Sequence, residues 1–232
     1  MNCEITQRGY QIKICTYMIT VNSGLAPNPF FGVCSLGLCT PNHMNANLCE
    51  GDYLIGLSSH ELMRKHLWND TRIIYAMTIS KVLGLDEYYK KYPEKRGNHS
   101  GNILEKYGDA IYREDSRGIL MHIPESQQHI GIESQDIKGN RVFIGEIFWH
   151  FGCNSIPLPD EKWTQPLKES FRGIRYIFDS DDNHGRAWAD EDLESFKTWL
   201  HKYPNGILGM PADMEDLTSD GEQNFGSVSC SS

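Results

Sequence analysis

Residues 12–32 read Ile-Lys-Ile-Cys-Thr-Tyr-Met-Ile-Thr-Val-Asn-Ser-Gly-Leu-Ala-Pro-Asn-Pro-Phe-Phe-Gly. Within this stretch a strand-like pattern gives way to residues that favour turns. Ile12 to Val21 alternates in its first half and is rich in β-branched residues, which predicts a strand. Ser23 to Gly32 holds two glycines and two prolines, too much turn chemistry for a helix or a strand. Val33 to Thr40 resumes a strand pattern. The chain is therefore expected to open with a strand, a rigid loop and a second strand.

The rest of the chain adds more strands and a few helices. Strands are predicted at Tyr53 to Leu57, Arg72 to Val82, Gly108 to Tyr112, Leu120 to Ile123, Arg141 to Phe151 and Ile174 to Phe178. Helices are predicted at His60 to Trp68, at Glu87 to Lys91 with Asp86 as N-cap, at Thr164 to Phe171, and at Asp190 to Tyr203 with Gly206 as the stop. The regular alternation of a doubly wound parallel sheet is missing. The expected fold is α+β, a mainly antiparallel or mixed β-barrel decorated with helices.

Length and composition predict one domain over residues 1–210 and a tail over 211–232. After Lys202 the chain has no Lys or Arg but several acidic residues, so the tail is expected to be solvated or disordered. No apolar run approaches the length of about 20 residues that a membrane span needs, and no secretion signal is apparent, so a cytoplasmic protein is expected. The net charge of −9 argues against a protein that coats duplex DNA, but not against one that reads a single base.

Seven cysteines are scattered along the chain without any CxxC pair. They are expected to be buried free thiols in a reducing compartment. A zinc site at Cys34, Cys39 and Cys49 would lack the close paired spacing of structural zinc sites. We therefore expect neither a metal nor a cofactor.

The loop Ala26-Pro-Asn-Pro-Phe-Phe-Gly32 is the strongest candidate for ligand binding. Its two prolines fix the backbone around Asn28, which can pair with a base edge, while Phe30 and Phe31 can stack on a base. The alternative is a braced turn whose phenylalanines fill the end of the barrel. Ser58 and Ser59 follow a strand and suit a phosphate or a carbonyl oxygen, or else cap a helix.

Further candidates lie later in the chain. Asp109 follows a glycine, so it can accept from a base amino group, act as a base, or stabilise a turn. Arg175 can clamp a phosphate or form a surface ion pair. The other expected ligand-binding residues are Tyr75, Tyr112 and His150.

Taken in order, these segments resemble the nucleotide modification associated domain 2 family of phage and bacteria. The resemblance spans about residues 12–211 and rests on the segments Ser23–Leu36, Gly51–Gly56, Ile74–Met77, Asp86–Tyr89, Gly108–Tyr112, Val142–Gly152 and Arg172–Arg175. It implies a PUA-like barrel, related to the ASCH, EVE and YTH domains that lodge a modified base in a pocket. The chain departs from the family pattern at Ala110, at Gly173-Ile-Arg175 and at Gly56-Leu-Ser-Ser59, so the ligand class can differ.

The expected function is to bind a nucleotide, nucleoside or modified base, free or within a strand, in nucleic-acid modification or nucleotide-based defence. One alternative is a hydrolase or transferase acting on a modified nucleoside, with Asp109, His150 and Ser58 as candidate groups. A second is a phage-encoded inhibitor or interaction subunit. The sequence leaves open whether the chain forms a homo-oligomer.

Overall fold

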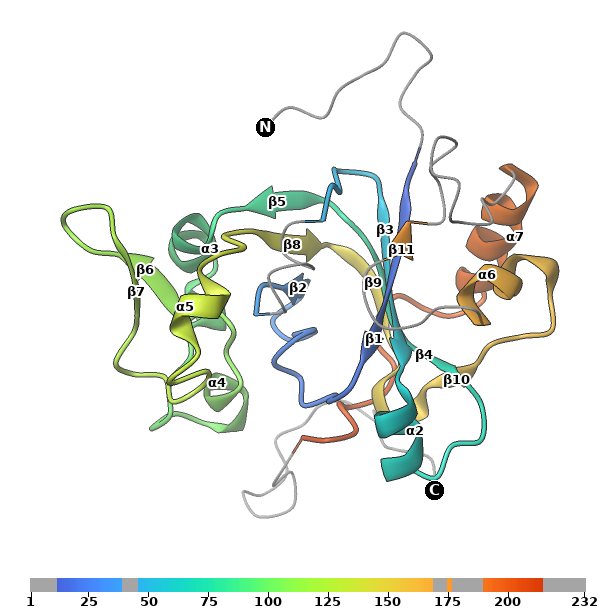
Figure 1. The fold of residues 1–232 in the computed structure, drawn as a ribbon, viewed down its shortest axis with the longest axis horizontal. Helices are drawn as coiled ribbons and strands as arrows, with labels where there is room; N and C mark the ends of the chain where they lie inside the picture. Colours follow the sequence, from blue (N-terminus) through green and yellow to red (C-terminus); the bar gives the residue numbers. More distant parts are fainter. Residues whose placement is uncertain (1–11, 39–45, 169–174, 177–189, 215–232) are drawn as a thin grey trace, which may run out of the picture.

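The computed structural model describes residues 12–38, 46–168, 175–176 and 190–214 (Figure 1). Its largest sheet contains, in spatial order, β11 (Arg175–Tyr176), β1 (Ile14–Ile19), β3 (Tyr53–Ser58), β4 (Arg72–Thr78), β9 (Ile147–His150) and β12 (Gly206–Ile207), and β10 (Ile156–Pro157) also pairs with β4. The β1–β3 and β12–β9 pairs are parallel, and the other pairs are antiparallel. We call it the main sheet.

A second, antiparallel sheet consists of β2 (Cys34–Leu36), β8 (Val142–Gly145) and β5 (Lys81–Leu83). Two stretches of chain pass from one sheet to the other, from β4 to β5 and from β8 to β9. They stay paired at the crossing, where the Ser80 N–H donates to Ile144 O at 2.7 Å. The expected long strands over 72–82 and 141–151 are therefore each broken into two by this bend.

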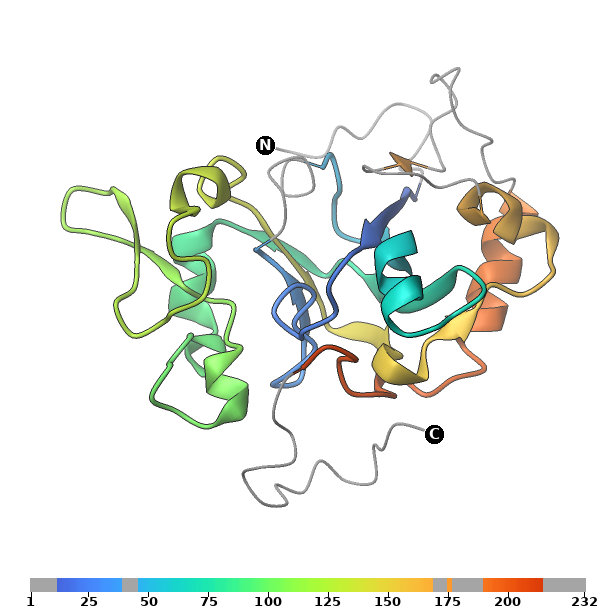
Figure 2. The same cartoon turned by 60° about the horizontal axis from the view of Figure 1, so that its bottom comes forward.

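The helices form two groups at opposite ends of the molecule (Figures 1 and 2). At one end are η3 (Lys162–Thr164), α6 (Gln165–Lys168) and α7 (Asp190–Leu200), which pack on one face of the main sheet. At the other end are α3 (Leu85–Lys91), η1 (Pro93–Lys95), α4 (Ile103–Lys106), α5 (Glu133–Asp136) and the hairpin of β6 (Tyr112–Glu114) and β7 (Leu120–His122). Two short helices, α2 (His60–Lys65) and η2 (Gly152–Asn154), flank strands of the main sheet.

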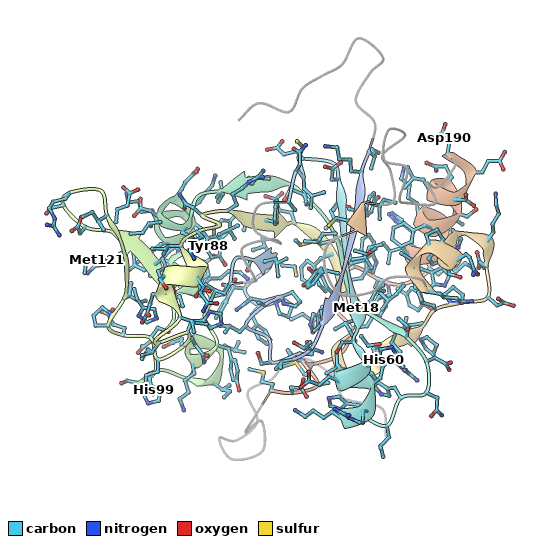
Figure 3. All side chains as sticks on the ribbon, viewed as in Figure 1. Met18, His60, Tyr88, His99, Met121 and Asp190 are labelled. Carbon is cyan, nitrogen blue, oxygen red and sulfur yellow. The ribbon has the colours of Figure 1, made fainter. Side chains whose placement is uncertain are left out.

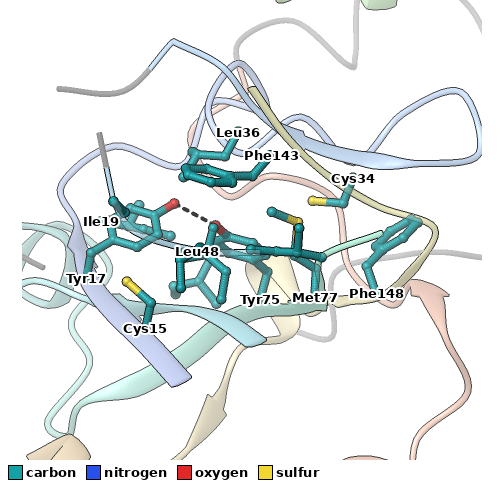
Figure 4. Close-up of a cluster of buried hydrophobic side chains, with 14 of the residues drawn as sticks. Cys15, Tyr17, Ile19, Cys34, Leu36, Leu48, Tyr75, Met77, Phe143 and Phe148 are labelled. Atoms are coloured by element: carbon teal, nitrogen blue, oxygen red, sulfur yellow. Dashed lines mark hydrogen bonds between the residues drawn. The ribbon is translucent and has the colours of Figure 1, made fainter. Parts of the chain in front are cut away.

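Three clusters of buried side chains make up the core. The first joins Trp163 and Phe196 to the main sheet. The second lies between the two sheets and includes Leu36, Met77 and Phe143 (Figure 4). The third packs the second sheet against α3 and the segment that leads into β6. Because the second cluster is shared, the two sheets act as opposing walls of one interior.

The α+β prediction is confirmed, with mixed and antiparallel sheets. Among the described residues the strand pairings do not close into a ring. Several expected boundaries are wrong. Gly84, not Asp86, is the N-cap of α3, and the Asp86 carboxylate instead accepts from Glu114 N at 2.9 Å. Gly206 begins β12, whereas α7 ends at Leu200, and the strand expected from Gly108 begins only at Tyr112.

The cysteines and the chain end also differ from expectation. Cys15 and Cys34 are buried thiols, but Cys49 and Cys153 are each disulfide-bonded, which corrects the expectation of thiols throughout. Beyond the expected domain boundary, the Asp213 N–H donates to Asn22 O at 2.8 Å and the Asp213 carboxylate accepts from Asn22 N at 2.7 Å. The remainder of the expected tail, from residue 215, lies outside the described residues. No described helix combines the length and hydropathy needed to cross a bilayer.

Candidate functional site

The Pro-framed loop docks on the start of the second sheet. The backbone N–H and C=O of Asn28 each bond to Ser35, both at 2.9 Å, and the Asn28 side chain is fully buried. Its amide Nδ2 donates to Tyr107 O at 2.9 Å, while Oδ1 accepts from Phe30 N at 3.1 Å. Asn28 therefore holds the loop together from inside rather than facing solvent.

Asn28 belongs to a buried group that we call the lysine network: Asn28, Ser35, Tyr88, Lys95 and Asp109, all fully buried. Lys95 Nζ has three acceptors, namely Asn28 O at 3.0 Å, Asn28 Oδ1 at 2.9 Å and Ser35 Oγ at 2.9 Å. Three acceptors match the three protons of an ammonium group. Ser35 Oγ donates to Asp109 Oδ2 at 2.6 Å, and Tyr88, on α3 (Figure 3), donates to Asp109 Oδ1 at 2.6 Å.

The lysine network holds two opposite charges away from water. Burial lowers the pKa of Lys95 and raises the pKa of Asp109, and the charge of each partner opposes part of that effect. The Ser35 hydroxyl connects the two charges, because it accepts from Lys95 and donates to Asp109. Every charged group in the network has its hydrogen bonds satisfied within the chain. The network is thus suited to join the second sheet to the α3–α4 end of the molecule.

A second polar group crosses the interior face of the main sheet. Tyr17, Gly56, Tyr75 and His150 are successive cross-strand partners on β1, β3, β4 and β9. The Tyr17 and Tyr75 hydroxyls lie 2.9 Å apart (Figure 4). A Cβ on Gly56 would lie 2.4 Å from Tyr75 Cε1, so only glycine leaves room for this ring. We call Tyr17, Tyr75 and His150 the tyrosine–histidine row.

His150 is the chemically distinctive member of the row. Its side chain is fully buried, and Nδ1 lies 3.0 Å from Gly209 O. A carbonyl oxygen can only accept, so Nδ1 carries the proton. Burial lowers the pKa of His150 to about 4, which keeps the imidazole neutral at pH 7. Nε2 is then a hydrogen-bond acceptor, and no described residue donates to it. An unmet buried acceptor costs about 1–3 kcal/mol, and Nε2 can still accept one N–H or O–H.

The remaining expected site residues do not share one location. Tyr112 donates to Asp136 Oδ2 at 2.8 Å, and the same oxygen lies 2.7 Å from His129 Nδ1, so Tyr112 forms a separate cluster. Phe30 is buried, and Phe31 is half-buried with a φ of 60°.

The two serines and the arginine lie on or beside the main sheet. Ser59 caps α2 by accepting from Leu62 N at 3.1 Å, as its capping alternative predicted. Ser58 Oγ accepts from Arg72 N at 2.8 Å. Arg175 lies on β11 opposite Thr16, and its side chain is outside the described part of the chain.

The structure thus brings Asn28 and Asp109 together in one network, and Tyr75 and His150 together in another group. Sequence reasoning missed Ser35, Tyr88 and Lys95 of the first group and Tyr17 of the second. For two of these residues the sequence did hold a signal of a possible role. Ser35 and Tyr88 lie within segments that carry the family resemblance.

Among the described residues, no group of three or more His, Cys, Asp or Glu side chains is placed to hold a metal ion. No curated protein and no solved structure matches the chain. The family model for nucleotide modification associated domain 2 matches residues 11–218, which is most of the sequence and includes both polar groups. This chain therefore belongs to the nucleotide modification associated domain 2 family.

Proposed function

We propose that this chain binds a nucleotide or nucleobase in the course of nucleotide modification, with the base against the tyrosine–histidine row. The family description supports a role in nucleotide modification. The observation that carries the choice of site is the buried, neutral His150, whose Nε2 has no donor among the described residues. Ring N–H and amino groups of bases are donors of the kind that this nitrogen accepts.

The neighbours of His150 suit a planar heterocycle. Tyr75 and Tyr17 offer aromatic faces as well as hydroxyl groups, and base–aromatic stacking is worth about 1–3 kcal/mol per base. The surrounding side chains, among them Leu36 and Phe143, are apolar. A mainly apolar pocket with a few convergent polar groups is the usual form of a small-molecule site.

In this proposal a base reaches the row past β12. This strand has only two residues, lies at the edge of the main sheet next to His150, and its Ile207 is half-buried. We expect residues 206–209 to move when a base enters. A PUA-like relationship is part of this proposal, because the two sheets share one interior in which a base can be enclosed.

Binding is favoured over catalysis because Asp109, the candidate general base, is engaged elsewhere. Both oxygens of Asp109 accept hydroxyl hydrogen bonds inside the lysine network. In this proposal Asn28 and Asp109 support the fold behind the site, and Phe31 is the aromatic of the Pro-framed loop that remains open to a ligand.

A thermal-shift screen over nucleobases, nucleosides, nucleotides and their modified forms tests the proposal. A ligand at a hundred times its Kd adds about 2.7 kcal/mol to stability. The compounds that raise the Tm are then titrated by calorimetry into wild type, His150→Phe and the control His99→Phe, which changes an exposed histidine. We expect binding to wild type and the control and its loss in His150→Phe. The proposal fails if no compound binds, or if His150→Phe binds like wild type.

A further inference from the structure

Arg72 and Ser155 form a contact with unused hydrogen-bonding capacity. Arg72 Nη1 donates to Ser155 O at 2.6 Å. Five buried side-chain atoms in the described part of the chain lack a hydrogen-bond partner, and two of them, Arg72 Nε and Ser155 Oγ, belong to this pair. Ser155 is only 4% exposed. Buried polar groups are normally paired, so two unpaired donors side by side indicate a missing acceptor.

A second serine contacts Arg72, at its backbone N–H. Ser58 Oγ accepts from Arg72 N at 2.8 Å, and its own hydroxyl proton has no acceptor among the described residues. Ser58 is 1% exposed and comes two residues after Gly56 on β3. The guanidinium N–H and the two serine hydroxyls can all donate to one group.

The charge of Arg72 is also unused. Arg72 forms no ion pair with any carboxylate in the described ranges, although the whole chain carries a net charge of −9. The Asp213 carboxylate is paired with other residues, since it lies 2.7 Å from Lys65 Nζ and 2.8 Å from His66 Nε2. Arg72 Cζ lies 5.2 Å from the centre of the Trp68 ring, which orients the guanidinium plane.

The geometry points to an oxyanion subsite at the start of β4, formed by Arg72, Ser155 and Ser58, which takes a phosphate group. A guanidinium whose Nη1 is occupied offers its Nε–Nη2 edge to two oxygens of one phosphate. The serine hydroxyls donate to the same phosphate. A cation beside donors of this kind selects an anion rich in acceptors.

The subsite lies beside the tyrosine–histidine row, at the start of the strand that carries Tyr75. Arg72 precedes Tyr75 by three positions on β4, a span of about 10 Å along a strand. A base at His150 and a phosphate at Arg72 would therefore belong to one nucleoside monophosphate. This assignment of the ligand rests on the proposed function, whereas the phosphate subsite rests on Arg72, Ser155 and Ser58 alone.

Calorimetry with three probes tests the subsite: inorganic phosphate, a nucleoside that the thermal screen selects, and its 5′-monophosphate. The variants are Ser155→Ala, Arg72→Lys and the control Arg64→Lys, which changes an exposed arginine on α2. Wild type and control should bind the monophosphate at least about tenfold tighter than the nucleoside, because hydrogen bonds to a charged group are worth about 1.5–3 kcal/mol. Ser155→Ala should lose about tenfold for the monophosphate and for inorganic phosphate, and nothing for the nucleoside.

The outcomes separate the two proposals. If Ser155→Ala and Arg72→Lys keep the wild-type preference for the monophosphate, the subsite is wrong. If inorganic phosphate binds and both variants weaken it while no nucleoside binds at all, the subsite stands and the proposed base site fails. Should Arg72→Lys unfold, Ser155→Ala decides the test. It removes one hydroxyl and leaves in place the hydrogen bond from Arg72 Nη1 to the Ser155 carbonyl oxygen.

Discussion

Replacing His150 by Phe should change how the stability of the free protein depends on pH. The folded pKa of His150 is about 4, because burial disfavours the charged imidazole, while the ordinary value is 6.5. Between these two values the unfolded chain binds a proton that the folded chain does not. The folded state of wild type is therefore penalised as the pH falls below 6.5, and the penalty levels off below pH 4.

The size of this effect follows from the distance between pH 5 and the ordinary pKa. That distance is 1.5 pH units, each worth about 1.4 kcal/mol, so wild type should lose about 2 kcal/mol at pH 5 that His150→Phe does not lose. At pH 7 the two proteins should differ little. The variant no longer has the unmet Nε2 acceptor, but it leaves Gly209 O without its donor, and each effect is worth about 1–3 kcal/mol.

Urea denaturation of wild type, His150→Phe and His99→Phe at pH 7 and pH 5 measures these differences. Other titrating groups cancel when the pH dependence of two proteins is compared. If wild type and His150→Phe lose the same free energy of unfolding between the two pH values, His150 is not a buried neutral imidazole. The assignment of Nε2 as an acceptor for a ligand would then be wrong.

Three other changes have outcomes that follow from the contacts described above. Lys95→Met should lower the free energy of unfolding by about 3–5 kcal/mol, because it leaves a buried carboxylate without its countercharge; a loss below about 1 kcal/mol in urea would contradict the network. Asn28→Ala should cost about 2–4 kcal/mol in the same assay and leave the affinity of the row for a base nearly unchanged, which calorimetry checks. Gly56→Ala should cost about 1–3 kcal/mol and weaken base binding, because its Cβ would collide with Tyr75, while Gly84→Ala, which meets only an ordinary contact at 3.7 Å, should be tolerated.

The strand pattern of the sequence was informative because side-chain alternation reports burial on each face. Ile14–Ile19 and Tyr53–Ser58 lie where strands were expected. The bend between β4 and β5 was not foreseen, since Ile79 is buried like the strand residues before it and the alternating pattern continues across the break. Hydrophobic alternation identifies extended segments, but it does not tell which sheet each segment joins.

The candidate site was only partly predictable for a similar reason. Asn28 and Asp109 were candidates because of their turn chemistry, and they are linked through Lys95 and Ser35. Lys95 stands in the run Glu94-Lys-Arg96, which is typical of a surface segment. Burial of that lysine depends on contacts with residues 60 and 67 positions away. Ser58, another expected ligand-binding residue, lies apart from both on the main sheet, where it accepts from Arg72 N. Long-range packing of this kind leaves no local mark in a single sequence.

The lysine network also constrains how this protein can change over evolutionary time. Ser35, Tyr88, Lys95 and Asp109 come from separate segments, yet Ser35 and Tyr88 both donate to the Asp109 carboxylate and Lys95 donates to Ser35. Loss of Lys95 alone leaves the buried Asp109 carboxylate without a countercharge. Replacement of Asp109 by a neutral residue at the same time removes that charge as well. Within the family, replacement of the lysine by an apolar residue should therefore be inherited together with replacement of the aspartate, and lineages that carry only one of the two changes should be rare.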